Sequence, residues 1–237
     1  MQITEQTTIA EAAAAVPASI RVFQRYGIDF CCGGRRPIGS ACEEQGVAFE
    51  TLVSAIEAAQ ATSEEESLDW SQKSLSALTR HIVRAYHEPL REELPRLESM
   101  AFRAARTHGA AAPLLASIEA LVGDLSSDLQ AHMHKEEVVL FPAIEAIEAA
   151  PHRPVFDISR PVAVMEHEHE HAGVLLAELR RMTGEYVPPS WGCATVRALY
   201  QGLAELDATM QVHVHLENNV LFPRALALAA GGAPAAS

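Results

Sequence analysis

Apolar residues recur along most of this chain every three or four positions, which is the period at which side chains line one face of an α-helix. Alternation of the strand type is nearly absent, and glycine and proline are sparse within the long stretches rich in Ala, Leu and Glu. The pattern therefore predicts an all-α protein. It predicts four long helices, with breaks at Pro142 and Pro223, over about 75–106, 113–150, 161–184 and 191–228.

Short connections rich in glycine, proline or polar residues separate these stretches. Four helices joined by modest loops favour an antiparallel four-helix bundle. Two shorter helices are expected ahead of it, at about 17–26 and 49–61, on either side of the sequence CCGG at 31–34. We expect an acidic linker, TSEEES, at 62–67. The predicted parts are a small helical N-terminal domain over 1–62, a bundle over 70–228 and a disordered tail over 229–237.

The chain of 237 residues is 49% hydrophobic, which suffices for a packed core, and no apolar run reaches the ~18–20 residues that a membrane span needs. Its amino terminus lacks the basic start of a signal peptide, so a cytoplasmic protein is expected. Lys and Arg number 18 against 31 Asp and Glu, giving a net charge of −13. Neither nucleic acid nor an anionic membrane is therefore an expected partner. Four cysteines are too few for a disulfide scaffold in a chain this long.

Two stretches of the chain are nearly the same: HMHKEEVVLFP at 132–142 and HVHLENNVLFP at 213–223. Seven of the eleven positions are identical. The differing positions lie mostly where a helix would face water. This pattern indicates a duplicated functional element.

The apolar face of each long helix is interrupted by a histidine, and two of the faces also carry a glutamate. The interrupting residues are His87, His132, Glu136, His169, His213 and Glu217. A single such histidine is commonly a hydrogen-bonded core residue, but a buried ionised glutamate is costly unless it is paired or bound to metal. Each half of the bundle supplies a histidine from one helix and His-x-x-x-Glu from the next. Six polar interruptions in this regular arrangement predict a metal site.

The residue types indicate which metal. Four imidazoles and two carboxylates, with no thiolate on the core faces, favour a borderline divalent ion. Six ligands are too many for one tetrahedral zinc ion, but they suit two iron ions, each held by two histidines and bridged by Glu136 and Glu217. Paired non-haem iron with open coordination positions binds O₂, NO, peroxide or an oxo bridge. Ferritin-like sites use Glu-x-x-His, so the His-x-x-x-Glu spacing argues against that class.

The two His-x-x-x-Glu pairs, each followed by LFP, resemble those of hemerythrin-like domains. Together with YGIDFCCGG at 26–34 and LENNVLFPRAL at 216–226, they make the chain similar to the RIC (repair of iron centres) di-iron family. In that family a hemerythrin-like bundle follows a CCGG (ScdA-type) domain. The likeness runs from about residue 5 to 228. It implies the same six ligands and a pair of non-haem iron ions that are carboxylate- and oxo-bridged.

The resemblance also implies a function. Members of the family are cytoplasmic homodimers that restore iron–sulfur clusters damaged by nitric oxide or oxidants, so the expected partners are proteins with damaged clusters, to which iron would be supplied. Two other functions stay open. The di-iron centre could reduce NO or nitrite with electrons from a redox partner, since no flavin or haem motif is present. It could instead bind or sense O₂ or NO, although CCGG has no obvious purpose in a plain carrier.

Cys31 and Cys32 are candidates for transferring iron or NO. Adjacent cysteines rarely form a disulfide with each other because the ring strains the peptide, and the two glycines that follow free the backbone to expose the pair. Nearby backbone N–H groups and the next two arginines are expected to lower a thiol pKa. The alternative is a buried cysteine beside a turn. Cys42 and Cys193 are interpreted as structural.

Other polar residues near the predicted site have weaker support. Asp128 and Glu168 each lie within one helical turn of a predicted ligand, and the resemblance makes them candidates for a polar path to the metals; solvated charges are the alternative. The pair His167-x-x-x-His171 has a spacing found in oxygen-carrying hemerythrins, but it lies off the apolar face and is expected to face solvent. His134 and His215 also lie off the apolar faces and are interpreted as surface residues, and no functional role is assigned to His81, His108 or His152.

Overall fold

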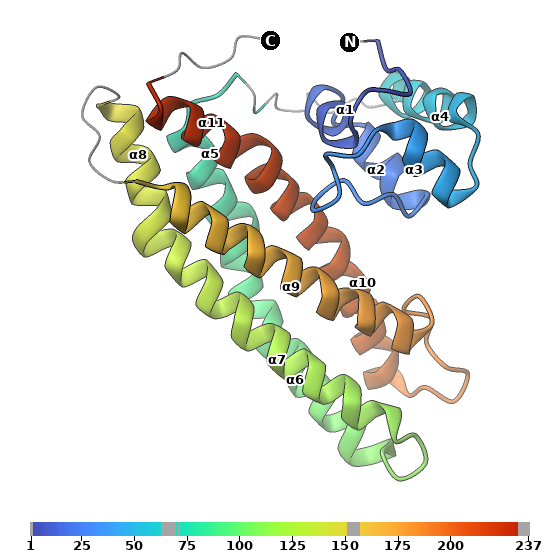
Figure 1. Cartoon of the computed structure of the whole chain (residues 1–237). Coiled ribbons are helices and arrows are strands. Elements are labelled where there is room, and N and C mark those ends of the chain that lie inside the picture. The colour runs from blue at the N-terminus through green and yellow to red at the C-terminus, as the bar shows by residue number, and fades with distance from the viewer. Residues whose placement is uncertain (1, 63–69, 71, 151–156, 232–237) are drawn as a thin grey trace.

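The structure, a computed structural model of the chain, is built from helices, which confirms the predicted all-α class (Figure 1). It describes residues 2–62, 70, 72–150 and 157–231. The predicted linker at 62–67 and the predicted tail at 229–237 fall mostly outside the described residues, as does His152. No helix within the described ranges is both long enough and apolar enough to cross a membrane.

Four short helices form the N-terminal part: α1 (Ile9–Ala15), α2 (Ser19–Arg25), α3 (Ile38–Gln45) and α4 (Phe49–Thr62). The sequence predicted α2 and α4 but not α1 and α3. A capping box begins α1, because the Thr8 hydroxyl accepts from the Glu11 N–H and the Glu11 carboxylate accepts from the Thr8 N–H. This Thr-x-x-Glu signal could have identified α1. The four helices enclose a core of their own around Phe23, Phe30 and Leu52.

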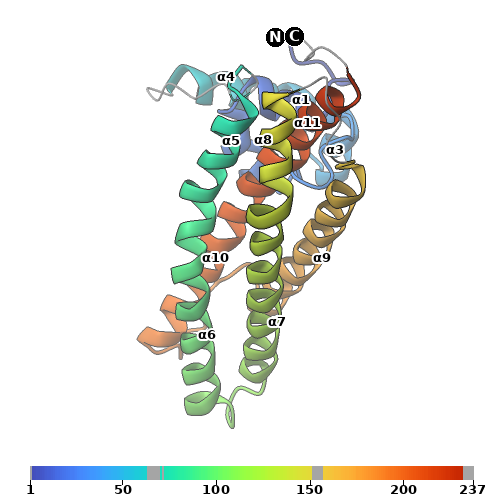
Figure 2. The ribbon, with the colours of Figure 1, turned by 90° about the vertical axis from the view of Figure 1, so that its left-hand side faces the viewer.

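Four long helical rods form the bundle (Figure 1 and Figure 2). Three of the rods contain a short π-helical segment. The first rod consists of α5 (Leu75–Ile82), η1 (Val83–His87) and α6 (Glu88–His108). The second consists of α7 (Leu114–Lys135), η2 (Glu136–Leu140) and α8 (Phe141–Ala149). The third is α9 (Ser159–Thr183) alone. The fourth consists of α10 (Ala194–His215), η3 (Leu216–Leu221) and α11 (Phe222–Ala229).

A proline lies two residues after each π segment: Pro89, Pro142 and Pro223. Proline lacks an N–H, and its ring crowds the carbonyl four residues earlier, so a regular α-turn is disfavoured there. A π turn closes its hydrogen bonds over five residues and takes up one extra residue. The breaks expected at Pro142 and Pro223 are therefore widened turns within continuous rods. The rod formed by α9 has no proline near its middle and is unbroken.

The bundle core consists of two apolar clusters with a polar layer between them. One cluster includes Leu97 and Leu125 from α6 and α7, and the other includes Ile144 and Phe222 from α8 and α11. Along each rod, the residues predicted as ligands fall between members of the two clusters, and all six are buried. The fold thus encloses the polar layer between two apolar ends.

Helices α1–α4 pack beside the fourth rod of the same chain (Figure 1). The Gln24 amide donates to the Ala208 carbonyl of α10 at 3.0 Å. The Asn219 amide in η3 donates to the carbonyls of Phe30 and Cys31 at 3.1 and 3.2 Å. The loop that carries CCGG therefore lies against the helix that carries two of the predicted ligands.

Candidate metal centre

The structure brings the six predicted ligands together in the polar layer, with every rod contributing at least one. They form two groups of four buried side chains, and within each group the ligand atoms lie within 4.8 Å of one another. One group is His87, Glu136, His213 and Glu217, and the other is His132, Glu136, His169 and Glu217. Both glutamates belong to both groups, as ligands shared by two ions would.

Each glutamate contacts one histidine of each group. Glu136 Oε2 lies 3.4 Å from His87 Nε2 and 3.3 Å from His132 Nε2. Glu217 makes the matching contacts, with its two oxygens each 3.1 Å from the Nε2 atom of a histidine on α9 or α10. All four imidazoles therefore present the same nitrogen to the carboxylates.

The charges in this layer depend on one another. Burial alone would raise the pKa of Glu217, but the neighbouring His213 and His169 hold that pKa well below its ordinary value. Burial would lower the pKa of His132, but the adjacent Glu136 carboxylate raises it to about 9. Two carboxylates thus share one buried layer, and the imidazoles beside them favour the ionised form of each.

Several oxygen atoms of the layer have no donor. Both oxygens of Glu136 and the Oε2 atom of Glu217 are buried without a hydrogen-bond partner among the described residues. Such atoms are costly, and two adjacent carboxylates also repel each other. Divalent cations would satisfy both demands, and a donor set of imidazoles and carboxylates suits iron. The polar layer fits a non-haem di-iron centre.

The imidazoles are also held from outside the layer. Three of the four donate their Nδ1–H to a neighbouring side chain: His87 to Glu137 at 2.7 Å, His132 to Glu168 at 2.9 Å and His169 to Asn218 at 2.8 Å. Outer partners of this kind orient the ring so that Nε2 faces the metal. Sequence reasoning missed Glu137 and Asn218. Both come directly after the ligand glutamate of the repeated motif, and that shared position is the signal that could have identified them.

The two acids predicted to form a polar path lie in different surroundings. Glu168 contacts the ligand His132 and also pairs with Lys135, so it connects the layer to the surface. Asp128 does not reach the layer; it is half exposed and lies 3.4 Å from His171 Nε2. His171 and His167 are both exposed to solvent.

Asp29, which sequence reasoning missed, organises the CCGG loop. Its carboxylate accepts from the backbone N–H groups of Cys31, Cys32 and Gly33 at 3.0, 3.1 and 2.9 Å, and Cys31 Sγ donates to it at 3.2 Å. The prediction of a lowered thiol pKa is therefore wrong for Cys31. The contact with Cys32, burial and the negative charge of Asp29 all raise the pKa of the Cys31 thiol.

The arginines after CCGG do not offset this effect. Arg35 pairs with Glu166 at 3.1 Å, and Arg36 pairs with Glu44. Each guanidinium thus has a carboxylate partner of its own. The thiols differ in access, because Cys31 is half-buried whereas Cys32 is exposed.

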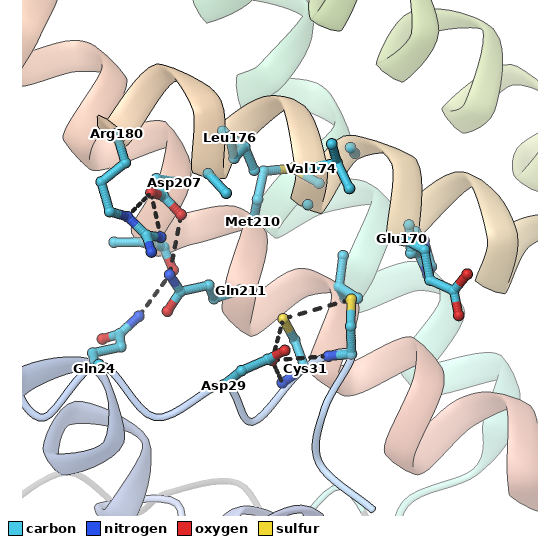
Figure 3. A pocket seen from close by; sticks show the side chains of 18 of the residues that line it. Gln24, Asp29, Cys31, Glu170, Val174, Leu176, Arg180, Asp207, Met210 and Gln211 are labelled. Carbon is cyan, nitrogen blue, oxygen red and sulfur yellow. Dashed lines mark hydrogen bonds and ion pairs between the residues drawn. The ribbon is translucent and has the colours of Figure 1, made fainter. Parts of the chain in front are cut away.

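A cavity of about 570 Å³ lies between the CCGG loop and the bundle (Figure 3). Its lining includes Cys31 and Cys32 from the loop and the predicted ligand His169 from α9. At the other end, Arg180 and Asp207 form an ion pair at 2.7 Å. The cavity gives a small molecule space beside both the cysteines and the metal layer.

His215 is buried, contrary to the interpretation as a surface residue. Its side chain is 1% exposed, and its Nδ1–H donates to the Phe30 carbonyl at 3.3 Å. Burial lowers the pKa of His215 to about 4. The physical reason is that Phe30, in the loop between α2 and α3, covers this face of α10. His134, its counterpart in the first repeat, is exposed as expected.

The remaining cysteines also differ from each other. Cys42 is buried, in line with a structural role. Cys193, interpreted from the sequence as structural, is exposed and caps the N-terminus of α10. Its Sγ lies 3.3 Å from His108 Nε2. The backbone N–H of Val196 at the start of α10 and the nearby His108 ring lower the pKa of the Cys193 thiol to about 7.

Comparison with known proteins matches both parts of the chain. A profile described as the hemerythrin HHE cation binding domain matches residues 78–225, and a domain of unknown function, ScdA_N, matches residues 5–60. The iron-sulfur cluster repair protein YtfE of Edwardsiella ictaluri is 38% identical over 92% of this chain and 96% of its own length. YtfE of Yersinia pseudotuberculosis is 36% identical over 90% of this chain and 94% of its own length.

Proposed function

The chain belongs to the hemerythrin HHE cation-binding family, in the two-part form that it shares with the YtfE proteins, and from this premise we propose that it repairs damaged iron–sulfur clusters by supplying iron. The observation that carries the proposal is the buried layer of four histidines and two glutamates beside a loop with two free cysteines. The clients would be proteins whose clusters nitric oxide or oxidants have damaged.

The six side chains of the layer would hold the two ions. His87 and His213 serve one ion, and His132 and His169 serve the other, while the two glutamates are shared. When bound, paired iron supplies ferrous ions for transfer and open positions for small ligands. The protein contributes preorganisation, because the outer partners hold three of the imidazole rings in place before metal arrives.

The cysteine loop would receive iron on its way to a client. Cys32 is exposed and offers a sulfur atom at the cavity, while Cys31 keeps its proton because its thiol pKa is raised. The Asp29 carboxylate already accepts from Cys31 Sγ and would take that proton when iron binds the sulfur. Because Asp29 would accept this proton, binding of iron by the loop should depend on Asp29.

The test is transfer of iron from the loaded full-length protein to an apo-protein that regains its iron–sulfur cluster. We expect cluster recovery with the wild type and none with Glu136→Ala combined with Glu217→Ala, because that variant lacks the shared carboxylates. A Cys32→Ser variant should retain its iron but transfer it more slowly. Undiminished transfer by the double glutamate variant would overturn the proposal.

A second candidate function is reduction of NO or nitrite at the same centre. The cavity favours it, since it gives a small molecule space beside His169. Reduction of two NO molecules to N₂O and water requires two electrons and two protons, so a redox partner would have to supply the electrons. Anaerobic N₂O production by the reduced protein with NO separates this function from repair, in which iron leaves the protein. Reversible O₂ or NO binding without either outcome would favour a carrier or sensor.

From the resemblance to the RIC family, which implies cytoplasmic homodimers, we further propose that the protein acts in the cytoplasm as a homodimer. Within one chain, the CCGG loop already contacts the fourth rod, so neither part needs a second copy to complete the site. Light scattering on the full-length protein measures the assembly state directly. A monomer at micromolar concentration would overturn the dimer and leave the repair function untouched.

A further inference from the structure

The four imidazoles of the metal layer are not supported equally from outside. Each ring presents Nε2 to the shared glutamates, so its Nδ1–H points away from the metal. We call the position served by His87 and His213 position A, and the position served by His132 and His169 position B. Because the glutamates are common to both positions, the ligands in which A and B differ are the histidines with their outer partners.

Position B has an acceptor behind each histidine. His132 donates to the Glu168 carboxylate at 2.9 Å, and His169 donates to Asn218 Oδ1 at 2.8 Å. Position A has an acceptor behind His87 alone, which is Glu137 at 2.7 Å.

The other histidine of position A, His213, has no such acceptor. Its Nδ1 atom is buried and without a hydrogen-bond partner in the part of the chain that the structure describes. The His213 imidazole stacks on the Tyr86 ring, with ring centroids 5.0 Å apart and an angle of 3° between the planes, and a ring face offers no acceptor in the plane of Nδ1–H. A metal-bound neutral imidazole carries its proton on the outer nitrogen. That N–H would therefore remain unsatisfied on His213 and satisfied on the other three histidines.

This difference affects the strength of metal binding. An outer acceptor makes the imidazole more basic and fixes its ring, and loss of one such partner typically weakens metal binding by about 10–100-fold. We infer that the two iron positions are unequal and that the iron held by His87 and His213, at position A, is the one that leaves first. The inference rests on the proposed function only in calling that iron the donated one; the inequality itself concerns binding.

Access would favour the opposite order. The cavity that holds the two cysteines is lined by His169, a ligand of position B, and includes neither histidine of position A. If the opening decided the order of release, position B would empty first. If support of the ligands decides it, position A empties first, and the iron remaining at position B stays beside the cavity. The two explanations predict opposite outcomes of one experiment.

The experiment follows loss of iron from the full-length protein, loaded with ferrous iron under anaerobic conditions, to an excess of a coloured ferrous chelator. We expect two phases of equal amplitude whose rates differ by about 10–100-fold. Crystals frozen after the first phase should show an anomalous iron peak at position B and a depleted one at position A. A single phase with both peaks falling together, or depletion of position B first, would overturn the inference.

Matched variants at Asn218 test the cause. Asn218→Leu removes from position B the kind of acceptor that position A lacks, so the slow phase should accelerate by about 10–100-fold and merge with the fast phase. Asn218→Asp provides a charged acceptor and should slow the slow phase further, which also shows that the site tolerates substitution. If neither variant alters the slow phase, the outer partners do not set the order. Since no client protein is present, failure of cluster repair leaves this result unaffected.

Discussion

The two halves of the bundle carry the same motif and use its inward-facing positions in the same way. Each motif supplies a histidine and a glutamate to the metal layer; the glutamate lies within a π segment, and a proline follows that segment. The likeness extends upstream of the motif. Gln130 donates to Ser126 at 2.9 Å in the first half, and Gln211 donates to Asp207 at 3.0 Å in the second, with the same spacing to the ligand histidine.

The outward-facing positions differ between the halves. His134 and Val138 of the first motif face solvent, whereas their counterparts His215 and Asn219 contact the loop that carries CCGG. The halves also differ at one buried position, where Ser126 of the first half is replaced by Asp207, which pairs with Arg180 at 2.7 Å. The comparison teaches that both halves use their inward positions for the metal layer, while the second half also uses its outward positions to contact the loop that carries CCGG.

The largest expected effect tests whether the two halves are equivalent at the metal. Glu136→Gln and Glu217→Gln should each reduce the iron content from two ions per chain to less than one, because each glutamate belongs to both groups of ligands. Elemental analysis of the purified variants measures this. Each variant should also gain less thermal stability from added iron than the wild type, since metal binding contributes to folding. Strong loss in one variant and none in the other would show that only one carboxylate is shared.

The next effect concerns the pair that only the second half contains. Asp207→Ala leaves Arg180 without its partner; a fully buried pair would cost ~3–5 kcal/mol, but Arg180 is 36% exposed, so we expect about 2 kcal/mol of unfolding free energy. Ser126→Ala, the matched change in the first half, should cost about 1 kcal/mol. Urea denaturation of both variants measures the difference. Equal losses would mean that the ion pair adds nothing beyond the shared hydrogen bond.

The repeated outward histidines provide a smaller test. His215→Ala removes a buried ring and its hydrogen bond to the Phe30 carbonyl, and should cost about 1–2 kcal/mol. It should also speed proteolysis of the CCGG loop. His134→Ala should change stability by less than about 0.5 kcal/mol because the side chain is exposed. If the two substitutions behave alike, the difference in burial between the motifs has no energetic consequence.

The smallest effect is at the beginning of the matching helices α7 and α10. Pro113 caps α7, whereas Cys193 caps α10 with a thiol pKa lowered to about 7. The thiolate fraction rises with pH, so the rate of alkylation of Cys193 by iodoacetamide should increase from pH 6 to 8 with a midpoint near pH 7. Mass spectrometry of the modified peptide follows it. A His108→Ala variant should move the midpoint upward; an unchanged midpoint would assign the whole shift to the helix terminus.

The periodicity and motifs of the sequence were sufficient to predict the four rods and to single out the six residues that converge. Those residues interrupt apolar faces, and a buried carboxylate leaves a strong signal in the sequence. The sequence could not predict the burial of His215, because that depends on where the N-terminal helices dock. It also misled on Cys31, since the effect of Asp29 depends on how the loop folds back on its carboxylate.

The three π segments also determine how the two apolar clusters of the bundle are aligned. An α-helix turns by about 100° for each residue, so one extra residue rotates everything beyond it by that angle. Three rods contain such an insertion at the metal layer and α9 does not. In these three rods, the core-facing residues on one side of the metal layer are therefore rotated about the helix axis relative to those on the other side. The two apolar clusters meet at the metal layer. Metal bound in this layer would link the four rods at the point where the helical register of the two apolar clusters changes.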